Sequence, residues 1–298
     1  AAAGAGGGAA RAQPALPGRR APSEWDDEGF AAQMEGMADY EAFMAPIKAE
    51  LFASHGGITD SDVVEVGMGN GPNLEAFAQA GVRSVHGVEP NEAMHGRALA
   101  AARRAGMPAG ALTLGTGVAE RLPLADASVT VLVSTMLLCS VSDLERSVDE
   151  AARVLRPGGR WYFVEHVAAS RDNVMLKSLQ SAFDGAQSAV CHGCHLTRSP
   201  LLAIAAHPAF APAPDGAGVT ARRFTLGDRS EADGWSWPPQ PPAAAASDSL
   251  RSDTSRASLY GQCVSGEGRG WSPEVHGAFP MPHFLLSPHV AGVAVKAA

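Results

Sequence analysis

Four short apolar segments rich in β-branched residues alternate with helical patterns along the middle of the chain. The apolar segments are residues 62–66, 84–88, 128–133 and 160–167. The helical patterns between them are residues 73–80, 92–104 and 143–155. Short continuous apolar runs are typical of strands that are buried on both faces. The alternation therefore predicts an α/β fold with a doubly wound sheet, whose ligands bind at the carboxyl ends of the strands.

Two stretches of biased composition interrupt or precede this pattern. Residues 1–25 are mostly Ala, Gly, Pro and Arg, and they predict a disordered tail because they cannot form a packed core. Residues 227–282 are rich in Pro, Ser and Ala, and at about 55 residues they far exceed an ordinary connection. Strands predicted at 219–226 and 290–296 flank that stretch. We therefore expect one domain over residues 30–298, interrupted by a low-complexity insertion at 227–282.

The charge balance indicates which partners to expect, and the cysteine count indicates the redox compartment. The chain has 23 Lys and Arg residues against 31 Asp and Glu residues, a net charge of −8. Nucleic acid is not expected as the main partner, because tracking phosphates requires clustered positive charge. Four cysteines in 298 residues are too few for a disulfide scaffold and indicate a reducing compartment. We expect no transmembrane span, since no apolar run reaches the roughly 18 to 20 residues that one requires.

The segment after the first predicted strand carries three alternating glycines, Gly67, Gly69 and Gly71. Glycines there allow a tight turn and let a ligand approach the backbone closely. The dinucleotide fingerprint would place its third glycine where this chain has Pro72, which disfavours a pyrophosphate site. About 20 residues on, Glu89 follows the second strand, where a carboxylate accepts hydrogen bonds from ribose hydroxyls. This pattern predicts a cofactor that contains adenosine.

Several motifs together resemble class I S-adenosylmethionine-dependent methyltransferases. They are Glu65-x-Gly67-x-Gly69-x-Gly71, Glu89 after the second strand, residues 119–128 and residues 154–159. Within that superfamily the chain is most similar to the methyltransferase-like protein 7 family, some of whose members methylate thiols. The segments that carry this similarity are residues 138–141, 153–159, 162–169, 193–198 and 288–296. The resemblance implies a Rossmann-like, seven-stranded, mostly parallel sheet with an antiparallel last strand.

The resemblance also implies that the cofactor is S-adenosyl-L-methionine. The implied cofactor-binding residues are Glu65, Gly67, Gly69, Gly71, Glu89, Ala119 and Glu120. The three glycines would pass under the methionine part, and Glu65 would orient their loop and meet the amino group. Glu89 would hold the ribose, and Glu120 with Ala119 would contact the adenine. The family has an Asp where this chain has Thr130, which removes one usual hydrogen-bond anchor.

The expected reaction is methyl transfer to a small-molecule acceptor, with a thiol as first choice and the oxygen or carbon of a quinol or phenol as second. His166 is the candidate catalytic base, because it follows a strand at the carboxyl edge of the sheet. An equally weighted alternative is that His166 only shapes the pocket. Asp184, His192 and His195 are weaker candidates.

Three other readings of the sequence compete with this one. Cys191-His192-Gly193-Cys194-His195 matches the pattern of covalent haem attachment and offers metal ligands, but the chain is not a small haem-binding fold and shows no second ligand pair. We therefore expect no metal. An NAD-dependent oxidoreductase would share the glycine loop and Glu89, although Pro72 disfavours it. A catalytically silent module that binds S-adenosylmethionine would keep the fold and lose turnover.

The start of the chain also suggests a location. It contains Arg11, Arg19 and Arg20 and no acidic residue before Glu24. An acid-poor, Arg-bearing start fits the remnant of an organelle transit peptide. Since plant and algal proteins similar to the resembled family are associated with plastids, we expect the chloroplast or another organelle, with the cytoplasm as the alternative.

Overall fold

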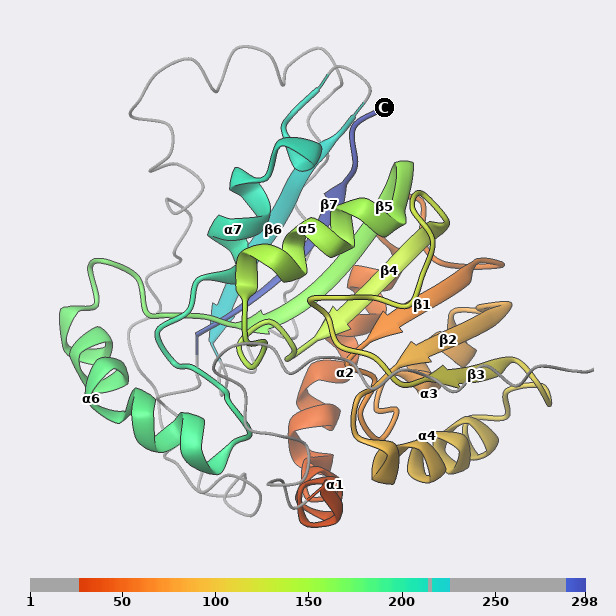
Figure 1. Cartoon of the computed structure of the whole chain (residues 1–298), viewed down its shortest axis with the longest axis horizontal. Helices are drawn as coiled ribbons and strands as arrows, with labels where there is room; N and C mark the ends of the chain where they lie inside the picture. Colours follow the sequence, from red (N-terminus) through yellow and green to blue (C-terminus); the bar gives the residue numbers. More distant parts are fainter. Residues whose placement is uncertain (1–26, 214–215, 226–287) are drawn as a thin grey trace, which may run out of the picture.

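The computed structural model of the chain describes residues 27–213, 216–225 and 288–298 (Figure 1). Both the predicted disordered tail at 1–25 and the predicted insertion at 227–282 lie outside the described residues and stay predictions. Helix α1 begins at Asp27, three residues before the predicted start of the domain. Among the described residues, no helix has both the length and the apolar character required to cross a membrane.

Helices and strands alternate along the described residues. In chain order they are α1 (Asp27–Glu35), α2 (Ala38–Ala53), β1 (Asp62–Val66), α3 (Leu74–Gln79), β2 (Ser84–Val88), α4 (Glu92–Arg104), β3 (Leu112–Gly115), β4 (Val129–Thr135), α5 (Leu144–Val154), β5 (Leu155–His166), α6 (Val174–Val190), α7 (Pro200–Ala206), the 3₁₀ turn η2 (Pro208–Phe210), β6 (Gly218–Thr225) and β7 (Pro288–Val295).

The described strands form one seven-stranded sheet in the order β3-β2-β1-β4-β5-β7-β6. Strands β1 to β5 pair in parallel, and β7 is antiparallel to both of its neighbours, β5 and β6. This confirms the predicted fold class, including the antiparallel last strand. The chain order reverses between β1 and β4, and open α/β sheets bind their ligands at such a switch point.

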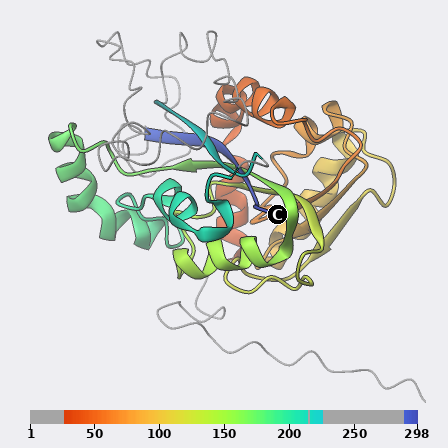
Figure 2. The same cartoon turned by 90° about the horizontal axis from the view of Figure 1, so that it is seen from above.

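Helices cover both faces of the sheet (Figures 1 and 2). One core packs α2, α3 and α4 against one face, and a second core packs α5 and α7 against the other. Successive residues of β4 divide between the cores, with Val131 and Val133 in the first and Leu132 in the second. Burial on both faces explains why the central strands are continuous apolar runs rather than alternating ones.

The structure adds elements that the sequence reading missed. Strand β3 has only four residues, and helices α1, α2, α6 and α7 were not predicted. The Arg156–Gly159 segment lies within β5, which begins at Leu155 directly after α5 ends, but these four residues have no partner in β4. The register between β4 and β5 shifts between Val129 and Val131, and this irregularity accommodates the Pro-Gly-Gly sequence within the strand.

Candidate active site

A cavity of about 600 Å³ lies at the carboxyl ends of β1 to β4. Its walls include the loops that follow these strands, at residues 66–72, 89–91, 117–120 and 135–141. Side chains of α1 and α2 line it as well, together with residues 187–194 at the end of α6. The volume is within the range of small-molecule sites. The cavity therefore occupies the edge at which the sequence predicts ligand binding.

The three glycines after β1 all have positive φ, but they serve two different purposes. An added Cβ at Gly67 would lie 2.7 Å from Leu137 Cδ1, and one at Gly71 would lie 2.5 Å from Leu74 Cδ1 and 3.3 Å from Ala98 Cα. At Gly69, by contrast, the nearest atom to a Cβ would be Met94 Sδ at 3.8 Å. The flanking glycines permit close packing within the protein, whereas the backbone of Gly69 faces open space in the cavity.

Glu89 lies where β2 ends and is 7% exposed. Its Oε2 accepts a hydrogen bond from the Gly69 amide at 2.9 Å, and its Oε1 accepts one from the Asn91 amide at 2.9 Å. A carboxylate has about four lone-pair directions, so it can accept several hydrogen bonds at once. Glu89 thus connects the glycine loop to the end of β2 at the cavity, which is where the sequence predicts a ribose-binding carboxylate.

Glu65 lies behind the glycine loop rather than among the residues that line the cavity. Its Oε1 accepts a 2.5 Å hydrogen bond from Asn73 Nδ2, which also donates to Thr135 Oγ1 at 3.0 Å. Burial raises the pKa of Glu65 to about 8. Within the described part of the chain, Glu65 Oε2 and Asn73 Oδ1 have no hydrogen-bond partner. This geometry suits the predicted role of orienting the loop, but not the predicted contact with the amino group of the cofactor, because Glu65 does not line the cavity. The sequence analysis did not identify Asn73.

Ala119 and Glu120 line the cavity from the connection between β3 and β4. The Glu120 carboxylate is 1% exposed and accepts hydrogen bonds from the Ser142 and Asp143 amides at 2.5 and 3.3 Å. Those amides precede α5, so Glu120 ties this connection to the start of that helix. Backbone groups of Ala119 and Glu120, more than the Glu120 carboxylate, are therefore available to a ligand.

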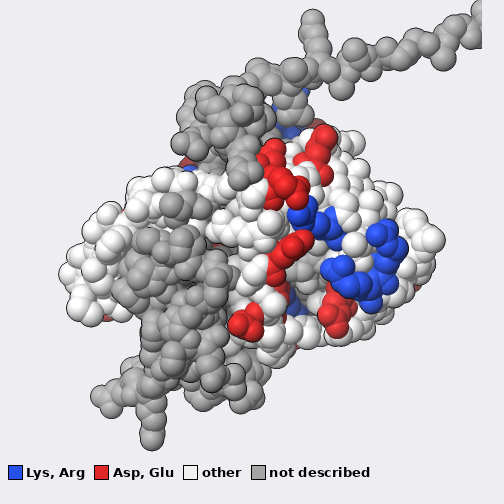
Figure 3. All heavy atoms as spheres, turned by 90° about the horizontal axis from the view of Figure 1, so that it is seen from below, with Lys and Arg blue, Asp and Glu red and all other residues white. Residues whose placement is uncertain are grey.

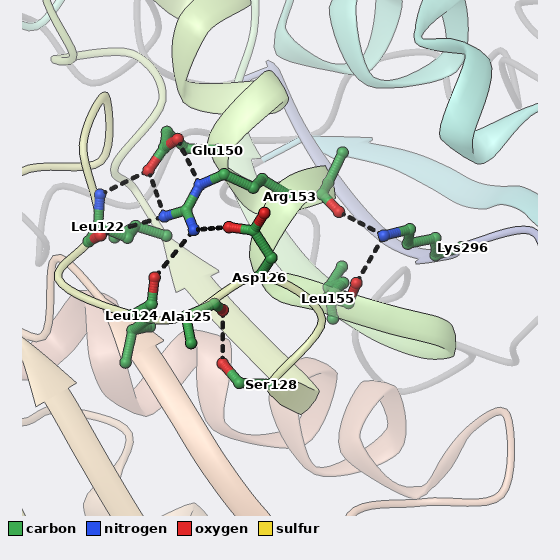
Figure 4. Close-up of polar contacts among 10 residues, drawn as sticks. Leu122, Leu124, Ala125, Asp126, Ser128, Glu150, Arg153, Leu155 and Lys296 are labelled. Carbon is green, nitrogen blue, oxygen red and sulfur yellow. Dashed lines mark hydrogen bonds and ion pairs between the residues drawn. The ribbon is translucent and has the colours of Figure 1, made fainter.

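Arg153 on α5 holds the rest of this connection in place (Figure 4). It makes two bonds to the Glu150 carboxylate, at 2.7 and 2.8 Å, and one to Asp126 at 2.6 Å. It also donates to the carbonyl oxygens of Leu122 and Leu124. The sequence motif at residues 119–128 is thus a loop that Arg153 holds in place. Of this motif, only Ala119 and Glu120 line the cavity.

His166 ends β5 and is fully buried, and it is not among the residues that line the cavity. Cys194 Sγ lies between 3.8 and 4.0 Å from its two ring nitrogens, and Cys194 does line the cavity. A base at this position reaches a ligand through the Cys194 sulfur rather than directly. The prediction that His166 lies at the carboxyl edge of the sheet is confirmed. The prediction did not anticipate that Cys194 would separate His166 from the cavity.

The Cys-x-x-Cys-His segment does not act as one unit. Cys191 and His192 line the cavity, Cys194 meets His166, and His195 Nδ1 donates a hydrogen bond to Asp184 Oδ2 at 2.8 Å. Cys139, which is distant from this segment in the sequence, lies beside Cys194 and His166. The fourth cysteine, Cys263, lies outside the described residues. The residues of the motif therefore point to different surroundings, which does not suit a covalently attached haem.

The three neighbouring side chains also shift one another's pKa values. The hydrogen bond with Cys139 lowers the pKa of Cys194 well below its ordinary value, against the opposing effect of burial. The same contact raises the pKa of Cys139. Burial alone would lower the pKa of His166, but the nearby Cys194 sulfur raises it. Of the two cysteines, Cys194 is therefore the one that ionises more readily.

Helices α1 and α2 supply an apolar wall that the sequence reading did not anticipate. Phe30, Met34, Met37 and Tyr40 line the cavity, and Phe30 stacks on His192 with ring centroids 3.7 Å apart. The available signal was their spacing of three to four residues, which is typical of one face of a helix. These side chains make this part of the cavity wall largely apolar.

Helix α1 is joined to α4 by charge pairs at the surface. Arg97 Nη2 lies 2.6 Å from Glu28 Oε1, and Arg97 Nε lies 2.7 Å from Glu35 Oε1. Figure 3, the view from below, shows basic and acidic side chains side by side on this face of the molecule. Exposed pairs contribute little stability each, so the apolar contacts of α1 dominate its attachment.

Thr130 stands where the resembled family has an Asp, and the structure places it at the start of β4. The cavity lies at the other end of that strand, where Thr135 lines it. The departure at Thr130 therefore does not remove a ligand contact.

Comparisons with known proteins agree with this geometry. Residues 64–163 match a family described as a methyltransferase domain. The human thiol S-methyltransferase TMT1A is 36% identical over 166 residues, which are 53% of this chain and 66% of the human protein. The rat thiol S-methyltransferase TMT1B is 32% identical over 158 residues, 51% of this chain and 62% of the rat protein. The chain thus spans slightly less than two thirds of the length of these relatives.

Solved structures share the fold across most of the chain. A structure of the Haloferax volcanii Trm112 methyltransferase activator with a methyltransferase matches 92% of this chain and 98% of its own, with 18% identity and a TM-score of 0.53. An S-adenosylmethionine-dependent methyltransferase from Thermotoga maritima matches 90% of this chain and 97% of its own, with 20% identity and a TM-score of 0.50. Residues 64–163 are therefore similar to a methyltransferase domain, and the sheet has the Rossmann-like fold of these solved structures.

Proposed function

We propose that this protein transfers a methyl group from S-adenosyl-L-methionine to the sulfur of a small-molecule thiol. The observation that carries the proposal is the cavity at the carboxyl ends of β1 to β4, which joins the glycine loop and Glu89 to an apolar wall. The similarity to thiol S-methyltransferases supports sulfur as the acceptor atom. An oxygen or carbon acceptor of quinol or phenol type is the second choice.

The residues present fit the cofactor. Because a Cβ at Gly69 would enter open cavity space, the glycine there leaves room for a ligand against the backbone. Glu89 lines the cavity with a carboxylate, the kind of group that accepts hydrogen bonds from ribose hydroxyls, and residues 117–120 line it as well. Pro72 lines the cavity at the position where a dinucleotide site needs glycine, which argues against NAD as the ligand.

When bound, S-adenosylmethionine supplies an activated methyl group, so the protein has to orient the acceptor and exclude water. The apolar side chains of α1 and α2 perform the second task. A thiol with a pKa near 8.5 is partly ionised at neutral pH, so a dedicated base is not required. We assign His166 a positioning role, because it reaches the cavity only through Cys194.

A matched pair of acceptors tests the proposal. The protein is incubated with S-adenosylmethionine labelled in its methyl group and either thiophenol or phenol, which differ only in the acceptor atom. We expect labelled thioether from thiophenol and little product from phenol. The reverse preference would move the reaction to oxygen. Cofactor binding without product from any thiol or phenol would support the silent module.

The location of the protein stays a prediction, since it rests on residues 1–25. We propose the chloroplast or another organelle from that composition. Fusion of residues 1–25 to a fluorescent reporter tests it, and a uniformly cytoplasmic signal would contradict it.

A further inference from the structure

Three buried side chains meet beside the cavity, and two of them, Cys139 and Cys194, line its wall. Cys139 is 2% exposed, His166 is 0% exposed and Cys194 is 8% exposed. They come from three separate segments, after β4, at the end of β5 and after α6. One sulfur from each cysteine and one ring nitrogen all lie within 4.8 Å of one another. Two thiols and an imidazole are a ligand set that suits zinc.

The spacing of these atoms suits a shared ion. Cys194 Sγ lies 3.8 Å from His166 Nε2 and 4.0 Å from Nδ1, which is long for a direct hydrogen bond. Zinc bonds of about 2.3 Å to sulfur and 2.0 Å to nitrogen place neighbouring ligand atoms of a tetrahedral site roughly 3.5 to 3.8 Å apart. Small side-chain rotations therefore bring the three atoms to the distances that one ion requires.

Charge and orientation support the same arrangement. Two thiolates neutralise a divalent cation, so the ion with its three protein ligands would bury no net charge before the acceptor binds. The His166 ring also hydrogen-bonds the backbone of His195. Histidine ligands of metals are commonly oriented by a second hydrogen bond of this kind, which leaves the other nitrogen for the ion.

Gln187 separately indicates that a ligand with a polar group binds here. Its side chain is 1% exposed and lines the cavity, and its Nε2 lies 3.7 Å from Cys194 Sγ. Its Oε1 has no hydrogen-bond partner among the described residues. A buried amide oxygen left unpaired costs about 1 to 3 kcal/mol. A hydrogen-bond donor on a ligand beside Cys194 would satisfy it.

We propose that Cys139, His166 and Cys194 bind one zinc ion whose fourth position opens to the cavity and takes the sulfur of the thiol acceptor. This inference deepens the proposed function and rests on it for the identity of the acceptor. The acceptor thiol releases its proton to solvent as its sulfur binds the ion. That sulfur then forms a bond to the methyl carbon, the bond from the methyl carbon to the sulfonium breaks, and its electron pair stays on S-adenosylhomocysteine. The neutral thioether product is a weak ligand and leaves.

Metal content tests the site without any activity measurement. The full chain is loaded with zinc, dialysed, and analysed for bound metal by mass spectrometry. We expect about one zinc per chain, and a charge-transfer absorption from sulfur to metal when cobalt(II) replaces it. Cys139→Ser and Cys194→Ser should each reduce bound zinc at least tenfold. Cys191→Ser is the matched control, because Cys191 lines the same cavity outside this group and should retain the metal.

Circular dichroism first checks that each variant is folded. An absence of tightly bound zinc in the folded parent chain, or an equal loss in the Cys191→Ser variant, would overturn the metal site.

Two further measurements separate the site from the proposed function. Calorimetry with S-adenosylmethionine is repeated on the chain after zinc removal, and thiol methylation is measured before and after zinc is restored. We expect the cofactor to bind in both forms and methylation to need zinc. Full methylation by the metal-free chain would overturn this inference and leave the proposed function intact. Zinc binding without any binding of S-adenosylmethionine would instead remove the proposed function and keep the metal site.

Discussion

The end of the cavity against β1 and β2 is built mainly from backbone, whereas the end against α1, α2 and α6 is built from side chains. At the first end, the glycine loop is fixed by the Glu89 bond to the Gly69 amide and by Asn73 beneath it. At the second end, Phe30 stacks on His192 and Cys194 meets His166. The first end is suited to one unchanging ligand, the cofactor. The second can change its specificity through single side-chain replacements.

This difference explains what the sequence could predict. Gly67, Gly69, Gly71 and Glu89 follow strands directly, so the order of local patterns places them at one edge of the sheet. Local patterns could not separate the packing role of Gly71 from the ligand-facing role of Gly69, because that depends on Leu74 and Ala98.

The other end of the cavity depends on contacts between distant segments. Cys139 and Cys194 are 55 positions apart in the chain, and only the docking of the segment after α6 brings them together. The wall from α1 had a helical signal in its spacing, but nothing local indicates that this helix covers the cavity. His166 was predicted at the correct edge, although its burial behind Cys194 follows from packing alone.

Removing the carboxylate of Glu89 should have the largest effect on the backbone-built end. Glu89→Ala should weaken binding of S-adenosylmethionine by about 2 to 4 kcal/mol, or roughly 30- to 1,000-fold, because charge-assisted bonds to the ribose and the loop are lost. Glu89→Gln should fall between the parent and Glu89→Ala. Calorimetry measures these affinities, with Glu75→Ala on the exposed face of α3 as the control. Equal affinities for Glu89→Ala and the control would contradict the assignment.

Two glycine replacements should separate ligand approach from packing. Gly69→Val should reduce cofactor affinity at least tenfold, about 1.4 kcal/mol, because its side chain enters the cavity. Gly71→Ala should instead destabilise the fold by about 2 to 4 kcal/mol, since its positive φ is strained for Ala and its Cβ meets α4. Urea unfolding and calorimetry on both variants check this. The comparison fails if Gly69→Val, once shown to be folded, binds the cofactor normally.

The buried acid beneath the loop should make stability depend on pH. Because the pKa of Glu65 is raised to about 8 in the folded chain, Glu65 keeps its proton there at pH values at which the unfolded chain has already released it. The protonated Glu65 therefore makes its full contribution to stability at acidic pH, and this contribution is lost as the pH rises toward 8. Glu65→Gln should exceed the parent in stability by roughly 1 to 3 kcal/mol near pH 8 and should differ little near pH 5. Unfolding curves across this range that stay parallel for parent and variant would refute the buried neutral acid.

The brace around the 119–128 loop should contribute the smallest effect. Arg153→Met removes the bonds to Glu150, Asp126 and two carbonyl oxygens, and its partly exposed position limits the loss to about 1 to 2 kcal/mol of stability. Cofactor affinity should fall less than tenfold, because the cavity itself is intact. Arg103→Met on the exposed face of α4 is the control in thermal unfolding. If Arg153→Met has the same melting temperature as that control, the network does not stabilise the loop.

Equilibrium dialysis of the purified chain against labelled S-adenosylmethionine tests the central claim, that the backbone-built end is a site for this cofactor. We expect saturable binding of one equivalent, displaced by S-adenosylhomocysteine and unaffected by excess NADH. Retention of NADH, with no binding of S-adenosylmethionine, would contradict the account and favour an oxidoreductase.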